Sequence, residues 1–143
     1  MWTSESAAPR IGKLMSTPQI RLLLVDDNKR LTSAWERLIG QQPDIKLVGT
    51  LDRADGLVGA TRENSADVIL IDLTMDGCDP LEAIAEVTRE CPQVHTLIYS
   101  ARSRSEWHDQ ARRAGAKDFL DKADDPSAIL AAIRRVSERA KKP

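Results

Sequence analysis

Short apolar runs recur along this chain, and two of them end directly in aspartate. Residues 20–25 form one run, which Asp26 and Asp27 follow, and residues 67–71 form another, which Asp72 follows. Runs of this length between polar residues are typical of buried parallel strands. Because ligands collect beyond the carboxyl ends of such strands, we expect the three carboxylates to meet at one edge of a sheet.

The apolar runs alternate regularly with segments of helical periodicity. Strands are predicted at residues 20–25, 45–50, 67–71, 94–99 and 117–120, and helices from Leu31 to Ile39, at 54–64, from Pro80 to Cys91, at 103–114 and at 126–139. Strict alternation implies a parallel sheet with helices on both faces, and right-handed crossovers favour the strand order 2-1-3-4-5. The predicted fold is a single doubly wound (βα)5 domain of the α/β class, with flavodoxin-like topology.

Composition excludes several classes of protein. The chain has 143 residues, enough for one domain, and its net charge of −1 gives no global attraction to nucleic acid or to an anionic membrane. No stretch approaches the ~20 consecutive apolar residues of a membrane span. Residues 1–18 lack the apolar segment of a signal peptide, so we expect a disordered tail there and one domain at 19–140. The two cysteines fit a reducing, cytoplasmic location.

Five polar residues at the predicted strand ends suggest phosphoryl-transfer chemistry. Asp26, Asp27 and Asp72 would repel one another unless a cation lay among them, and hard oxygen ligands suit Mg²⁺. Asp72 is the candidate nucleophile and would form an aspartyl-phosphate. Lys122 would place a fixed positive charge opposite a phosphoryl oxygen, and Ser100 would donate a hydrogen bond to the attached group.

At these residues the chain resembles the receiver domains of two-component response regulators. The matching segments are residues 24–28, 71–75, 99–101 and 115–122, and the likeness extends over about 20–139. Each segment alone is a weak signal, but the four occur in the expected order and each follows a predicted strand. The chain is similar to receivers of the helix-turn-helix DNA-binding class.

The resemblance implies a specific reaction. Asp72 would accept a phosphoryl group from a phosphohistidine on a sensor histidine kinase or on a histidine phosphotransfer protein. The receiver would catalyse this transfer itself and lose the group slowly, so it is not expected to be an enzyme in the usual sense. Mg²⁺ would be held by Asp26, Asp27, Asp72 and, by the family pattern, the backbone carbonyl of Thr74.

The resemblance also implies a conformational switch. Phosphorylation would draw the Ser100 hydroxyl inward, and Phe119 would rotate with it. The surface formed by the predicted fourth helix (103–114), fifth strand (117–120) and fifth helix (126–139) would then bind a downstream protein or a second copy of the chain. Direct binding of nucleic acid or membrane by this chain is not expected.

Four residues depart from the family pattern, and one of them is Ala123, which follows Lys122 where the family frequently has proline. Asp76 follows Met75 where the family usually has proline, and Pro80 stands where it usually has glycine. These changes alter the loop beside the phosphorylation site, and they leave open a degenerate receiver that binds partners without phosphorylation. Phe119 replaces the commoner tyrosine, so it lacks the hydroxyl that donates a hydrogen bond in the active state.

Two other functions share parts of this pattern. A phosphatase of the haloacid dehalogenase type needs an Asp-x-Asp pair, but residues 72–74 read Asp-Leu-Thr. A flavin-binding domain needs a Ser/Thr/Gly run after the first strand, where residues 27–30 read Asp-Asn-Lys-Arg. The last predicted helix ends at Arg139 and four residues follow, so we expect no attached output domain, unless the chain has been truncated.

The sequence also predicts the environment of three side chains outside the motifs. Trp35 lies on the apolar stripe of the first predicted helix and is expected in the core. His108 is expected to face solvent. Trp107 is one of few apolar anchors on its helix, and it could pack on the sheet or serve as a contact for a partner.

Overall fold

The chain folds into a five-stranded parallel sheet covered by helices on both faces. The computed structural model describes residues 18–75, 77–101 and 105–141. Its elements are β1 (Ile20–Val25), α2 (Lys29–Gly40), β2 (Ile45–Leu51), α3 (Leu57–Glu63), β3 (Val68–Ile71), α4 (Pro80–Glu90), β4 (His95–Ser100), α5 (Ser105–Ala114), β5 (Asp118–Asp121) and α6 (Pro126–Lys141). The strand order is β2-β1-β3-β4-β5, which confirms the predicted fold class and topology. The predicted tail at 1–18 lies, except for its last residue, outside the described residues.

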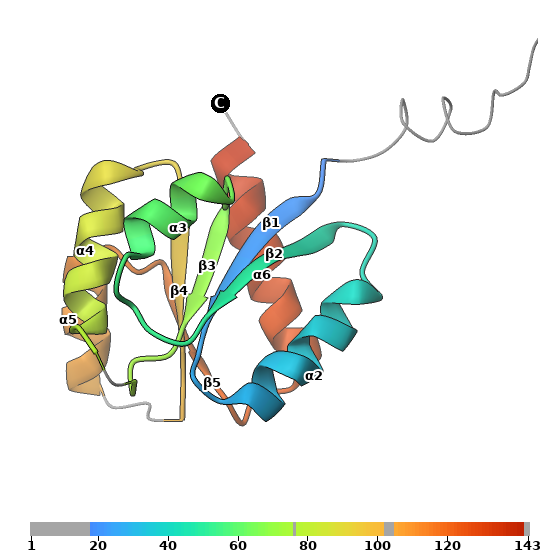
Figure 1. Cartoon of the computed structure of the whole chain (residues 1–143), viewed down its shortest axis with the longest axis horizontal. Helices are drawn as coiled ribbons and strands as arrows, with labels where there is room; N and C mark the ends of the chain where they lie inside the picture. Colours follow the sequence, from blue (N-terminus) through green and yellow to red (C-terminus); the bar gives the residue numbers. More distant parts are fainter. Residues whose placement is uncertain (1–17, 76, 102–104, 142–143) are drawn as a thin grey trace, which may run out of the picture.

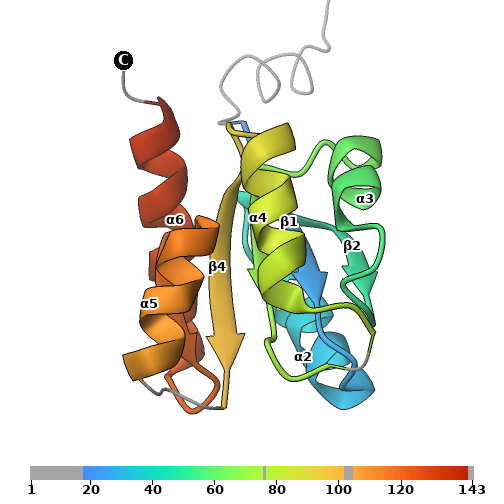
Figure 2. The ribbon, with the colours of Figure 1, turned by 90° about the vertical axis from the view of Figure 1, so that its left-hand side faces the viewer.

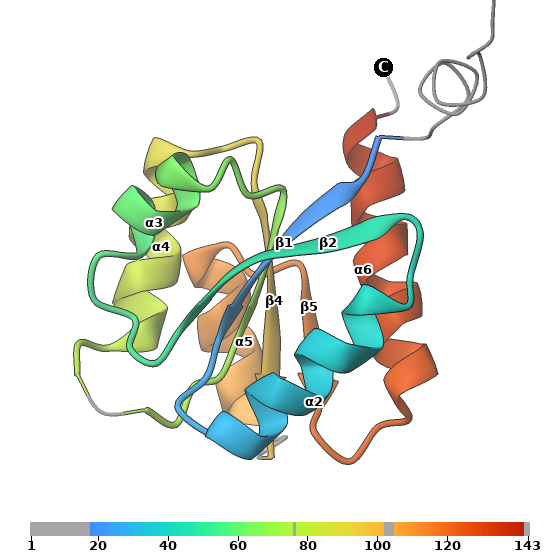
Figure 3. The same ribbon diagram turned by 45° about the vertical axis from the view of Figure 1, so that its right-hand side comes forward.

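The strands divide the core into two layers. In β1, Leu22 and Leu24 face one layer, while Leu23 and Val25 face the other, as the twofold repeat of a strand requires. Helices α2 and α6 cover the first layer, and α3, α4 and α5 cover the second (Figures 1 and 2). Figure 3 shows the same two layers from another side. Because both faces are covered, the central strands are apolar throughout, which explains why they read as continuous runs.

Helix capping fixes where the loops leave the sheet edge. The Asn28 side chain accepts a hydrogen bond from the Leu31 amide (3.2 Å) at the start of α2. Asp79 caps α4 in the same way through the Leu81 amide (3.0 Å), with Pro80 in the first turn. The sequence therefore sets the exit directions of the chain after β1 and before α4, on either side of the candidate site.

Several predicted boundaries differ from the structure by one to three residues. Helix α3 begins at Leu57 and not at residue 54, because Gly56 has a left-handed backbone (φ 71°) that ends the preceding turn. Strand β4 extends through Ser100, which pairs in register with Asp121 of β5. Ser100 is therefore the last residue of β4 and not the first residue after it.

A glycine controls the turn between α5 and β5. Gly115 has φ 117°, a conformation that side chains rarely adopt, and a Cβ there would overlap the side chain of Thr88 in α4. The Thr88 hydroxyl donates to the carbonyl oxygens of Ile84 and Ala114, both at 2.8 Å. The close approach of α4 to the end of α5 therefore depends on the missing side chain. Among the residues described, no helix is both long and apolar enough to span a bilayer.

Candidate functional site

Three carboxylates meet where β1 and β3 end. The parallel register pairs Val25 with Ile71, so Asp26 and Asp72, the next residues, lie side by side. One carboxylate oxygen from each of Asp26, Asp27 and Asp72 lies within 4.8 Å of the others. Asp26 and Asp72 are 2% and 3% exposed, whereas Asp27 is exposed to solvent. The predicted convergence of the three acids at one sheet edge is therefore present in the structure.

Hydrogen bonds with the backbone and an ion pair hold Asp26 in place. Its amide donates to the carbonyl of Leu51 in β2 (2.8 Å), which continues the ladder beyond β1. Its Oδ1 accepts from the Asn28 amide (2.9 Å), and its Oδ2 lies 2.7 Å from the Lys122 ammonium. These contacts direct a nearly buried carboxylate toward Asp72 and leave the neighbouring Asp27 at the solvent side.

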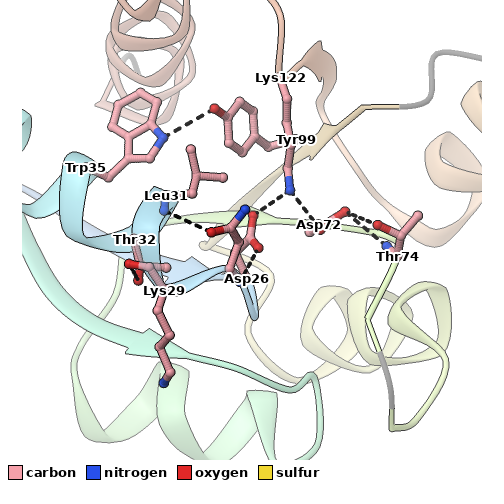
Figure 4. Close-up of polar contacts among 10 residues, drawn as sticks. Asp26, Lys29, Leu31, Thr32, Trp35, Asp72, Thr74, Tyr99 and Lys122 are labelled. Atoms are coloured by element: carbon pink, nitrogen blue, oxygen red, sulfur yellow. Dashed lines mark hydrogen bonds and ion pairs between the residues drawn. The ribbon is translucent and has the colours of Figure 1, made fainter.

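Asp72 uses both of its oxygens. Oδ1 accepts from the amide and the hydroxyl of Thr74, both at 3.0 Å, and Oδ2 accepts from Lys122 at 2.9 Å (Figure 4). The Asp72 amide donates to the carbonyl of Val25 (3.0 Å), which fixes the backbone against β1. The two nearly buried acids thus share one cation, with Thr74 on the far side of Asp72.

Lys122 reaches the pocket from the turn after β5. Its amide donates to the Ser100 carbonyl (3.0 Å), and the turn is closed by the Ala123 amide on Asp121 (2.8 Å). Burial lowers the pKa of Lys122, but hydrogen bonds from its ammonium to Asp26 and Asp72 outweigh that effect and raise the pKa above its usual range. The ammonium is therefore a permanent positive charge between the two acids.

The two predicted switch residues lie on neighbouring strands, β4 and β5. Ser100 is 1% exposed at the end of β4, and Phe119 is half-buried on β5. The Phe119 ring packs against the ring of His108 in α5, with centroids 4.0 Å apart and planes inclined by 34°. The prediction that His108 faces solvent was wrong, because the ring is half-buried against Phe119.

The loop between β3 and α4 has an anchor that the sequence did not indicate. Asp76 lies outside the described residues, but the Cys78 amide donates to Asp55 Oδ1 (3.2 Å) and Arg53 lies 3.3 Å from the same oxygen. The Cys78 amide and the Arg53 guanidinium hold the pKa of Asp55 below its usual value. Because Asp55 follows β2, no local pattern links it to this loop.

An aromatic pair lies next to Lys122 and was also not predicted as part of the site. Trp35 of α2 and Tyr99 of β4 are each 4% exposed, and the indole Nε1 donates to the Tyr99 hydroxyl oxygen (3.3 Å). The Lys122 Nζ lies 5.7 Å from the centroid of the Tyr99 ring. Trp35 is in the core, as its helical spacing predicts. The sequence pattern gave no signal for its contact with Tyr99, 64 positions away.

The chemistry of the donor set fits Mg²⁺. Its oxygens are hard ligands, they come from separate strand ends, and the exposed Asp27 leaves a side open to water and substrate. The Lys122 ammonium offsets one of the three negative charges, and a divalent ion would neutralise the other two. In an open parallel α/β sheet, ligands bind at the switch point beyond the carboxyl ends of the strands, which is where this acidic pocket lies.

The chain belongs to the response regulator receiver domain family, whose sequence model matches residues 22–134. Receiver domains of this family bind Mg²⁺ at an acidic pocket and interact with histidine kinases and output domains. The chain is therefore a receiver domain of two-component signalling. The family match favours the receiver over the haloacid dehalogenase and flavin-binding alternatives.

Relatives of known name are transcriptional and response regulators. The chain is 30% identical to the response regulator UvrY of Escherichia coli K12 over 117 residues, which cover 82% of this chain and 54% of UvrY. It is 31% identical to the transcriptional regulatory protein LiaR of Bacillus subtilis 168 over 119 residues, which cover 83% of this chain and 56% of LiaR. The chain thus spans about half the length of the curated relatives that it matches.

Solved structures show the same architecture. A LuxR-family two-component response regulator from Aurantimonas sp. SI85-9A1 superimposes with a TM-score of 0.78 at 27% identity, covering 84% of this chain and 86% of that one. The receiver domain of the response regulator NarL from Mycobacterium tuberculosis superimposes with a TM-score of 0.79 at 23% identity, covering 85% and 98%. The second likeness concerns the fold alone.

Proposed function

We propose that Asp72 is the phosphoacceptor of this domain and that a histidine kinase or a histidine phosphotransfer protein supplies the phosphoryl group. The observation that carries the proposal is the Lys122 ammonium, 2.9 Å from Asp72 and 2.7 Å from Asp26, beside a third acid. A nucleophilic carboxylate, a fixed cation and a ligand set for Mg²⁺ are the groups that this transfer needs. We place the functional domain at residues 19–140.

The transfer moves one phosphoryl group between two side chains. An oxygen of Asp72 forms a bond to phosphorus while the bond between phosphorus and the donor imidazole nitrogen breaks. The electron pair of that bond stays on the nitrogen. The Lys122 ammonium, already beside Asp72, stabilises the negative charge that gathers on the phosphoryl oxygens. The buried Ser100 hydroxyl donates a hydrogen bond to the product.

Mg²⁺ would be held by Asp26, Asp27, Asp72 and the backbone carbonyl of Thr74. When bound, the ion neutralises charge on the phosphoryl oxygens. The residues of the protein position and orient the reacting groups. Asp26 stays nearly buried and directed at Asp72, Asp27 keeps the solvent side polar, and the Thr74 amide and hydroxyl orient one Asp72 oxygen.

Ser100 and Phe119 are the proposed switch. Ser100 ends β4 and Phe119 lies on β5, which pairs with β4 in parallel. The His108 ring against Phe119 connects that side chain to α5. Movement of Phe119 would therefore change the surface made by α5, β5 and α6. We propose that this surface, defined by those three elements, binds a downstream protein or a second copy of the chain.

The test is direct labelling of the whole chain. Incubation with Mg²⁺ and a small acyl-phosphate donor is expected to add one phosphoryl group, a gain of about 80 Da by intact mass. Asp72→Asn is expected to abolish the gain. Asp79→Asn is the matched control, because Asp79 caps α4 near the pocket without belonging to it, and it should still be labelled. An unlabelled wild-type protein would overturn the proposal and favour the degenerate receiver.

A further inference from the structure

The Lys122 ammonium has an aromatic ring as a neighbour as well as two carboxylates. Its Nζ lies 5.7 Å from the centroid of Tyr99, within the range of about 6 Å over which a cation is attracted to a ring face. Figure 4 shows Trp35, Tyr99 and Lys122 in succession, leading to Asp26 and Asp72. The lysine therefore lies between an aromatic ring and the acids.

Trp35 fixes the position of that ring. The indole meets the Tyr99 ring edge to face, with centroids 5.9 Å apart and planes at 88°, an arrangement that aromatic pairs favour. The indole N–H also donates to the Tyr99 hydroxyl oxygen at 3.3 Å. Both side chains are almost fully buried, so packing and a hydrogen bond together hold the ring plane beside Lys122.

A lysine in this position needs such support. Its ammonium ends a flexible chain of four methylene groups, and its three donors impose no fixed geometry. The contacts with Asp26 and Asp72 draw Nζ toward both acids, but the chain that carries it can reach them through several rotamers. A fixed ring beside the ammonium favours the arrangements in which the charge stays above its face.

We infer that Tyr99 is a positioning residue that holds the Lys122 ammonium for phosphoryl transfer, and that Trp35 holds Tyr99 in turn. The inference rests on the proposed function of Asp72. Tyr99 touches neither the phosphoryl donor nor the reacting oxygen, so its effect passes through Lys122. The arrangement also connects helix α2 to the pocket through side chains, because Trp35 lies on α2.

The kinetic test compares two changes at Tyr99 in the full chain. Tyr99→Leu removes the ring and is expected to slow labelling of Asp72 by a small acyl-phosphate donor about fivefold. Tyr99→Phe keeps the ring and should stay within about twofold of the wild type. Leu130→Ala is the control, because Leu130 is buried in the same core layer as Tyr99 and has no part in the proposed phosphoryl transfer. It should lower stability and leave the rate unchanged.

A spectroscopic measurement reports whether the Tyr99 ring lies over the Lys122 side chain. In protein labelled with ¹³C at the lysine ε-carbons, the Lys122 signal, identified by its loss in Lys122→Arg, should be shifted upfield by the ring current of Tyr99. Tyr99→Phe should retain that shift. This readout needs only the wild type and conservative variants, so it stands even if Tyr99→Leu does not fold.

The outcomes distinguish the two proposals. If the wild type is not labelled at all, the proposed function fails, whatever the ring does. If the wild type is labelled but Tyr99→Leu reacts equally fast, the positioning role is wrong and the function of Asp72 stands. A Lys122 signal with no ring-current shift in the wild type would overturn the positioning role independently.

Discussion

At the residue scale, the pocket depends on one ammonium group placed between two carboxylates that are nearly inaccessible to solvent. Asp26 and Asp27 are adjacent in sequence, yet the first is buried against Lys122 and the second faces water. The two acids therefore differ in what they contribute. Asp26 is part of the ionic core of the pocket, whereas Asp27 adds negative charge at its rim.

Lys122→Gln is expected to lower the free energy of unfolding by about 2 kcal/mol, because it leaves Asp26 and Asp72 facing each other without a cation. The value is below that of a fully buried pair, since the lysine side chain is 21% exposed. Mg²⁺ should restore much of the loss. Urea unfolding with and without Mg²⁺ measures both effects.

Lys29→Gln is the control for that change. Lys29 and Asp52 form an exposed pair at 4.0 Å, and such pairs contribute little. If Lys122→Gln costs no more than Lys29→Gln, Lys122 does not stabilise the two acids in the way that the geometry indicates.

At the element scale, α6 is joined to the loop between α2 and β2 by a charge pair. Arg134 donates to Asp44 through Nε (2.7 Å) and through a second nitrogen (3.0 Å), and that second nitrogen also donates to Gln42 (2.8 Å). The hydrogen bonds from Arg134 hold the pKa of Asp44 below its usual value of 3.8. The pair therefore fastens the last helix to the edge of the fold, away from the acidic pocket.

Arg134→Gln is expected to lower the free energy of unfolding by about 0.5–1 kcal/mol at neutral pH, since both side chains are more than a third exposed and screened by water. Because folding lowers the pKa of Asp44, the stabilisation is present above pH 3.8 and is lost as the pH falls through the folded-state value. The difference between wild type and variant should therefore shrink in acid.

Denaturant unfolding of both proteins across pH 2–7 is the measurement. Arg135→Gln serves as the comparison, because Arg135 makes one longer contact of 3.5 Å with Asp118 and should cost less. A gap between wild type and Arg134→Gln that stays constant with pH would show that Asp44 does not titrate against this arginine.

The sequence predicted the strands and the meeting of the acids correctly, but it did not predict every helix boundary. The strands and their order followed from apolar runs, because a strand covered on both faces must be apolar at every position. Asp26 and Asp72 could be placed together because parallel strands bring their carboxyl ends to one edge. The start of α3 was missed because the left-handed backbone at Gly56 leaves no periodic signal.

Contacts between side chains that are distant in the sequence could not be predicted from local patterns. A helical stripe shows that Trp35 is buried, but not that it meets Tyr99, because the stripe does not say which strand residue lies beneath it. The same holds for Arg134 and Asp44, which are 90 positions apart. The prediction for His108 was wrong because a largely polar helix does not indicate which of its faces packs on β5.

At the scale of the whole molecule, the pocket joins the ends of four strands. Asp26 follows β1, Asp72 follows β3, Ser100 ends β4, and Lys122 follows β5. These strands also separate the two core layers, and each of the central strands contributes side chains to both layers. A ligand that bridges the strand ends therefore restrains the strands that hold both layers together. Binding there should therefore stabilise the domain as a unit and not one element alone.

Mg²⁺ with beryllofluoride, a mimic of the attached phosphoryl group, is expected to raise the melting temperature. At a ligand concentration one hundredfold above Kd, the stabilisation is about 2.7 kcal/mol. For a domain of this size that corresponds to a rise of roughly 8–11 °C. Asp72→Asn removes the oxygen that would hold the mimic, so this variant should respond to Mg²⁺ at most and gain nothing further from beryllofluoride. Differential scanning calorimetry on both proteins measures the rise, and an equal gain in the variant would place the mimic elsewhere on the molecule.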